Sequence, residues 1–172
     1  MTYQFRSVLS VLSVSVLLAA CGGGDEGAIV NDDNPAPTAL SASLTVAAST
    51  NAALNGVYST NTVALNNVTK VNPVGGDPET CRFRFSGLRQ AGTTRTMDGD
   101  IRYIPGTNET RTVFVSIDTI EYRLSGSVGA SVDRTNGRVN FTNAVLGATQ
   151  STGATINLTG SIPMLGNRPE GC

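Results

Sequence analysis

Residues 80–88 read Thr-Cys-Arg-Phe-Arg-Phe-Ser-Gly-Leu and alternate between apolar and polar side chains. The apolar side chains of Cys81, Phe83 and Phe85 alternate with two arginines. Strict alternation has the period of a half-buried β-strand, in which one face is dry and the other is wet. A sheet with one solvated face is typically antiparallel. The stretch therefore predicts an antiparallel strand with its aromatic rings in the core.

The same alternation recurs along the rest of the chain, and no segment shows sustained helical periodicity. Counting these runs predicts about eight strands. The runs lie near residues 41–48, 55–66, 80–88, 95–104, 110–118, 119–126, 138–146 and 154–162. The region 117–121 fits either the break between two strands or the middle of one bent strand.

Turn-forming residues separate these runs. Residues 105–108 (Pro-Gly-Thr-Asn), 133–137 (Asp-Arg-Thr-Asn-Gly) and 151–153 (Ser-Thr-Gly) predict tight connections, because Gly and Asn tolerate positive φ. Residues 66–79 form the longest expected loop. Short links between sequence neighbours predict an all-β, single antiparallel domain, either a meander barrel or a two-layer sandwich. The barrel is preferred because closure removes exposed strand edges.

The first residues divide into the parts of a secretory signal. Arg6 precedes an apolar run over residues 8–18, which at about eleven residues is too short to span a bilayer core. Leu18-Ala19-Ala20-Cys21 then resembles the lipobox of bacterial lipoproteins. The resemblance implies a signal peptide over 1–20 and lipidation of Cys21. The Gly, Asp, Asn and Pro residues that follow predict a flexible tether, so that 21–38 holds the lipidated cysteine and the tether. The alternating runs predict a β-rich domain over 39–172.

The lipobox resemblance also implies how the chain meets a membrane. The Cys21 thiol would take a diacylglyceryl group, and the amine freed by cleavage would take a further acyl chain such as palmitate. Two or three chains hold a protein stably to lipid. Gly22 follows the cysteine where retained inner-membrane lipoproteins often carry Asp, so the resemblance favours the outer membrane of a Gram-negative envelope. The Gly-, Asp- and Pro-containing tether would span roughly 20–25 Å.

Cys81 and Cys172 remain once Cys21 is assigned to lipid. An even pair of cysteines in an oxidising compartment predicts a disulfide. This bond would tie the last residue of the chain to the strand that carries Phe83 and Phe85, and its role would be structural.

The chemical inventory argues against catalysis. The chain has no histidine, which removes the commonest general base and metal ligand. Lys70 has no serine at a catalytic spacing, and Asp98 and Asp100 are better explained as solvent-facing strand residues than as an acid–base or calcium-binding pair. No cofactor or metal site is predicted. The net charge of −1 and locally balanced charges argue against nucleic acid as a partner.

Three functions remain in order of support. The first is a membrane-anchored, non-catalytic envelope lipoprotein that binds a protein partner or stabilises an assembly. The second is a lipocalin-like carrier of a small apolar ligand, in which Gly99 and Gly160 would leave room inside a barrel. The same two glycines fit tight packing or barrel corners equally well. The third is a carboxylate-based hydrolase. A carrier requires an apolar cavity, whereas a partner-binding domain has a filled interior and an exposed recognition patch.

Overall fold

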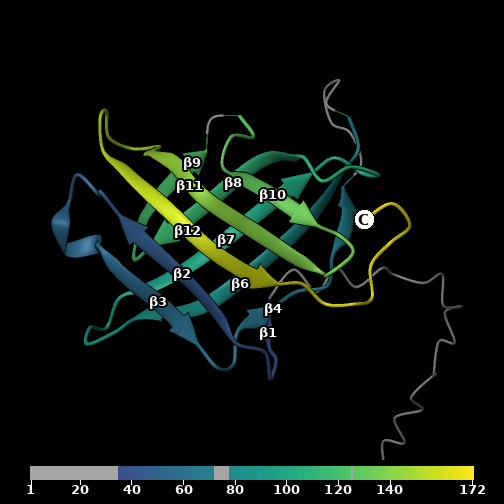
Figure 1. Ribbon diagram of the computed structural model, residues 1–172, viewed down its shortest axis with the longest axis horizontal. Helices are drawn as coiled ribbons and strands as arrows, with labels where there is room; N and C mark the ends of the chain where they lie inside the picture. The colour runs from purple at the N-terminus through teal and green to yellow at the C-terminus, as the bar shows by residue number, and fades with distance from the viewer. Residues whose placement is uncertain (1–34, 72–77, 125) are drawn as a thin grey trace, which may run out of the picture. The chain divides into compact units, whose positions relative to one another are not determined.

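Eight antiparallel strands close into a barrel in the computed structural model of this protein, which describes residues 35–71, 78–124 and 126–172 (Figure 1). The strands follow one another around the barrel in chain order, and β12 pairs with β2 to close it. They are β2 (Ala42–Ala47), β3 (Gly56–Thr60), β6 (Thr80–Gln90), β7 (Thr96–Tyr103), β8 (Thr110–Ile117), β9 (Ile120–Leu124), β11 (Arg138–Ala148) and β12 (Thr155–Pro163). The predicted meander barrel is confirmed, and the two-layer sandwich is not formed.

Four short strands lie outside the barrel path. β4 (Ala64–Leu65) and β5 (Thr69–Val71) pair with β6, β1 (Ala36–Pro37) pairs with β4, and β10 (Ala130–Asp133) pairs with β11. β1 falls in the stretch that the sequence assigns to the tether, and β5 falls in the expected long loop. A single 3-10 turn, η1 (Ala52–Leu54), precedes β3 within the described residues.

The strand expected over residues 55–66 is divided into β3 and β4. The chain turns at Asn61 and Thr62, where the Thr60 hydroxyl accepts a hydrogen bond of 3.1 Å from the Thr62 backbone N–H. A hydroxyl bonded to the backbone two residues ahead favours a turn over a continued strand. This turn lets β4 pair with the middle of β6, whereas β3 pairs with its end.

The connections between the long strands follow the turn signals. Residues 105–108 join β7 to β8, residues 133–137 join β10 to β11, and residues 151–153 lie between β11 and β12. The region 117–121 forms two strands, because the chain reverses at Asp118 with φ of 54°.

In the 133–137 turn, hydrogen bonds from the side chain and the backbone N–H of Asn136 lower the pKa of the Asp133 carboxyl.

The core is formed by the inward-facing residues of every barrel strand. In β2 each second side chain is buried and the others are exposed, as alternation requires. The largest fully buried side chains are Tyr58, Tyr103, Phe83, Phe85, Leu44, Leu54, Leu65, Leu88, Met97, Ile101, Ile117 and Leu146. The Tyr58 hydroxyl donates to the Leu54 carbonyl at 3.0 Å, so its polar atom is satisfied. Burial raises the pKa of Tyr58.

Candidate functional site

A groove of about 540 Å³ lies on the outer wall of the barrel over β6, β7, β8 and β9. We call it the β6–β9 groove. Its charged lining is Arg84, Asp98, Asp100 and Glu121, and its neutral lining includes Ser86, Phe114 and Ser116. Pro35, the first described residue, also lines the groove.

Strand register places these side chains together. Because alternate residues of a strand point outward, residues that are paired across neighbouring strands form rows on the outer wall. One row crosses all four strands as Arg84, Asp100, Phe114 and Arg123. The next row crosses β7, β8 and β9 as Asp98, Ser116 and Glu121.

Phe114 is the aromatic centre of the groove. It is half-buried on the polar side of β8, between the fully buried Val113 and Val115. The Arg123 guanidinium lies 5.5 Å from its ring centroid, a distance suited to a cation–π contact. The groove therefore combines an apolar platform with charged and hydroxyl groups that can orient a bound segment.

The two aspartates that the sequence analysis weighed as a catalytic pair both have structural partners. Asp100 receives hydrogen bonds from Arg82 Nε at 3.0 Å and Nη2 at 2.7 Å. Asp98 accepts a hydrogen bond of 3.0 Å from the backbone N–H of Gly87, in the β-bulge of β6. Asp98 and Asp100 thus lie on the outer wall, as the alternation predicted. Within the described segments, no group of three or more His, Cys, Asp or Glu is placed to hold a metal ion.

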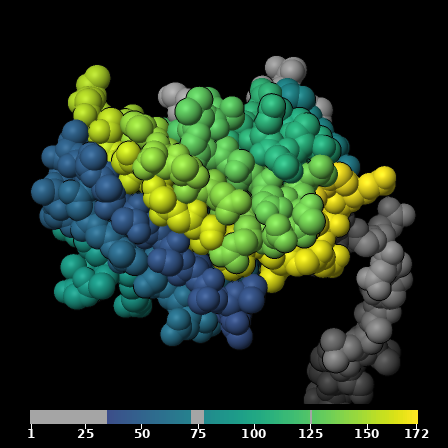
Figure 2. Space-filling view, viewed as in Figure 1, coloured from purple at the N-terminus to yellow at the C-terminus, as the bar shows by residue number. Residues whose placement is uncertain are grey.

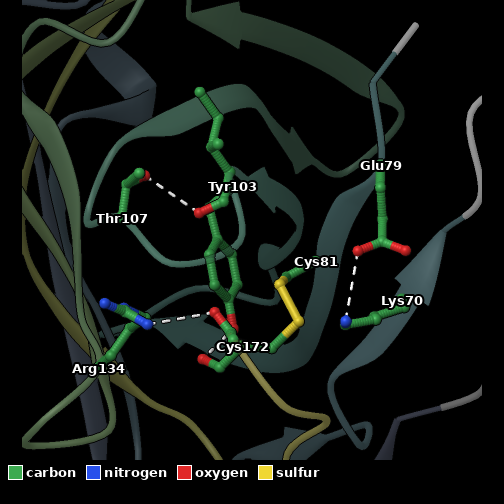
Figure 3. The surroundings of a disulfide bond; sticks show 9 residues. Lys70, Glu79, Cys81, Tyr103, Thr107, Arg134 and Cys172 are labelled. Atoms are coloured by element: carbon green, nitrogen blue, oxygen red, sulfur yellow. Dashed lines mark hydrogen bonds and ion pairs between the residues drawn. A yellow bond between two sulfur atoms is a disulfide. The ribbon is translucent and has the colours of Figure 1, made fainter.

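The expected disulfide between Cys81 and Cys172 is present (Figure 3). Their Cα atoms are 5.7 Å apart, and both residues are buried. Hydrogen bonds hold the same tail. The Tyr103 hydroxyl donates to the Cys172 carbonyl at 2.8 Å, and Arg134 donates to the Gly171 carbonyl at 3.2 Å. Burial raises the pKa of Tyr103 to about 12, although nearby Arg168 and Arg134 act in the opposite direction.

Lys70, the only lysine of the chain, forms an ion pair with Glu79, with Nζ 3.3 Å from Oε1. Figure 3 shows this pair close to the disulfide. Both side chains are substantially exposed, so the pair contributes little to stability.

Of the two roles that the sequence allows for Gly99 and Gly160, the structure shows tight packing and not room for a ligand. A Cβ atom on Gly99 would overlap the ring of Phe85, which already fills the space above it. At Gly160 a Cβ atom would overlap the backbone carbonyl of Ser43 on β2. Both glycines therefore serve close packing between strands.

Cys21 and the rest of the lipobox lie outside the described residues. Among the residues that the structure describes, no helix is long and apolar enough to cross a membrane.

The sequence pattern gives no indication that Phe114, Ser116 and Glu121 share a groove. One feature of β8 could have indicated Phe114. In the alternating pattern of this strand, Phe114 is an aromatic residue at an outward position where a polar side chain is expected. Strand alternation alone could not show that β6 and β9 contribute to the same surface, because that depends on register across four strands.

Comparison of the chain with protein families, curated proteins and solved structures finds no match.

Proposed function

We propose that this protein is a non-catalytic binding module of the bacterial envelope, anchored in the outer membrane through acylated Cys21. The β6–β9 groove would receive a segment of an envelope protein. The observation that carries this proposal is that free space lies on the outer wall of the barrel and not beside its inward-facing glycines. The inward space above Gly99 and Gly160 is filled, whereas the groove over β6–β9 lies open on the outer wall.

Charge suggests the chemistry of the partner segment. Asp100 is paired with Arg82, but Asp98 and Glu121 join no ion pair with another described residue. Two carboxylates beside the half-buried Phe114 ring suit a segment with a basic side chain next to an apolar one. Because Asp98 and Asp100 both make structural hydrogen bonds, binding accounts for them better than acid–base catalysis does.

The proposed role of the groove can be tested by site-specific crosslinking in the native envelope. A photoreactive residue in place of Ser116 would lie in the groove, whereas one in place of Thr45 would lie on exposed β2 across the barrel. We expect a discrete protein adduct from position 116 alone. Glu121→Gln should weaken this adduct, and Glu109→Gln, which removes an exposed carboxylate elsewhere, should not. Equal adducts from both positions, or no effect of Glu121→Gln, would contradict the proposal.

The membrane anchor can be tested separately. Cells grown with a labelled palmitate analogue should label the protein, and Cys21→Ser should abolish both the label and recovery in the outer-membrane fraction. A labelled Cys21→Ser protein would show that lipid is attached elsewhere.

A lipocalin-like carrier of small apolar ligands is the second candidate, because a closed eight-stranded meander is the architecture of such carriers. Native mass spectrometry of the periplasmically expressed protein separates the two proposals. A reproducible added mass that is lost on denaturation would favour the carrier, whereas crosslinking from Ser116 would favour the groove.

A further inference from the structure

A second hollow, of about 260 Å³, lies on the wall of the barrel away from the β6–β9 groove. It forms where β2 begins, β3 ends, β11 begins and β12 approaches its end. These four strands are in front in Figure 1, and their surface faces the viewer in Figure 2, with β2 and β3 in blue, β12 in yellow and β11 in green. We call this hollow the hydroxyl pocket.

The lining of the hydroxyl pocket is polar but almost uncharged. Its polar side chains are Ser41, Ser43, Ser59, Thr60, Asn61 and Ser161, with a single charged residue, Arg138. The lining contains no acidic residue. The pocket therefore carries a net positive charge and many groups that can donate hydrogen bonds.

Arg138 is half-buried, and its guanidinium is held in one orientation. Its Nε and Nη2 atoms both donate to the Ser161 hydroxyl oxygen, at 3.1 and 2.7 Å. It joins no ion pair with any other residue that the structure describes. Asp133, its partner in the β10–β11 register, accepts hydrogen bonds from Asn136 with both carboxylate oxygens. Asp133 does not line the pocket, and Arg138 makes no ion pair with it, so the half-buried guanidinium faces the hollow and can bind an added anion.

Ser161 extends this donor arrangement. A hydroxyl has two lone pairs and one hydrogen, and two Arg138 donors occupy the acceptor capacity of Ser161. Its hydrogen is left to donate to another group. Arg89, which is directly opposite Ser59 in the β3–β6 register, adds a second positive charge beside the pocket. Donors and positive charge therefore come from several strands.

We propose that the hydroxyl pocket binds a phosphate group, either free or on the headgroup of an anionic lipid. A phosphate presents several acceptor oxygens to donors from different directions, and Arg guanidinium matches them with more than one hydrogen bond. The volume leaves room for the phosphate and a small attached group. The site is separate from the β6–β9 groove, so it does not depend on the proposed partner-binding function.

The test uses the mature chain with Cys21→Ser, so that no acyl chain contributes to membrane association. Inorganic phosphate is titrated by calorimetry, and sedimentation is measured with vesicles of phosphatidylcholine alone or mixed with phosphatidylglycerol. Arg138→Gln should weaken binding at least about tenfold, since a charge-assisted hydrogen-bond donor is lost. Arg138→Lys should restore part of the affinity. Arg111→Gln, which removes an exposed arginine on β8 across the barrel, should leave binding unchanged.

The outcomes distinguish a site for free phosphate, a site for a lipid headgroup and the absence of a phosphate site. Phosphate binding that depends on Arg138 supports the site and identifies a free anion as sufficient. Arg138-dependent binding to phosphatidylglycerol vesicles alone supports it and identifies a lipid headgroup. The proposal is overturned if neither probe binds, or if Arg111→Gln weakens binding as much as Arg138→Gln does. Unchanged circular dichroism and thermal unfolding of the variants would show that the fold is intact in each case.

Discussion

Replacing both Cys81 and Cys172 with alanine should destabilise the barrel strongly without changing its native structure. The bond closes a loop with a sequence separation of 91 residues. In the chain-entropy model the stabilisation grows with the logarithm of loop length, and this loop gives about 4–5 kcal/mol at 25 °C. For a domain of this size, that free energy corresponds to a fall in the melting temperature of roughly 15 °C. The loss is a large part of the 5–15 kcal/mol that is typical of a folded domain.

The tail should remain in place in the folded variant, because noncovalent contacts also hold it. Tyr103 and Arg134 donate to the carbonyls of Cys172 and Gly171, and the Gly106 backbone N–H donates to the Gly171 carbonyl at 2.8 Å. The disulfide is therefore expected to act mainly by restricting the unfolded chain. A prediction specific to this mechanism is that the variant unfolds with a larger urea m-value, since its unfolded state exposes more surface.

Urea unfolding of the oxidised wild type and of the double variant, followed by circular dichroism, measures both quantities. The wild type treated with a phosphine reductant is a second comparison, and it should resemble the double variant. A loss of less than about 2 kcal/mol with an unchanged m-value would refute the reasoning, because the disulfide would then restrict the unfolded chain too little to explain its stabilising effect. A changed native spectrum would instead show that the bond is needed to form the native structure.

Two further predictions concern the core. Above pH 10, where the tyrosines of the unfolded chain ionise, the free energy of unfolding should fall until the pH reaches about 12, because burial raises the pKa of Tyr103 to that value and favours its neutral form. Tyr103→Phe should reduce this pH dependence in urea titrations, and an identical slope in the variant would assign the effect to another group. Gly99→Ala should destabilise the barrel by about 1–3 kcal/mol because its methyl group would overlap the Phe85 ring. Gly147→Ala, on β11 with open space around it, is the matched control and should change thermal stability little; equal effects of the two substitutions would contradict the packing argument.

The sequence was most informative where local rules decide the structure. Alternation placed Phe83 and Phe85 inward, and the turn residues of 105–108 and 133–137 marked real chain reversals. These predictions hold because side-chain direction in a strand has a period of two and because Gly and Asn adopt positive φ at little cost. The cysteine count also indicated the disulfide, since two cysteines remained for one pairing.

Side-chain alternation and turn preferences were least informative about which distant strand each segment pairs with. The run 55–66 alternates as one strand, yet it turns after Thr60 so that β3 and β4 pair with different parts of β6. Its pattern did not show this turn, because a Thr hydroxyl can bond the backbone in a turn or remain exposed on a strand. The extra strands β5 and β10 are short and pair with long barrel strands, so their own sequences carry a weak signal.

The amino-acid sequence was enough to predict an all-β chain, its inward and outward residues, its main turns and its cysteine pair, and it predicts the lipid anchor at Cys21. The pairing of β12 with β2, which makes the sheet a barrel and not a sandwich, could be established only from the folded chain. The folded chain also shows that the Phe85 ring covers Gly99 and that two hollows lie on different walls. The physical reason is the range of the interactions. Alternation and turn preference act over a few residues, whereas closure, register and packing depend on segments that lie far apart in the chain.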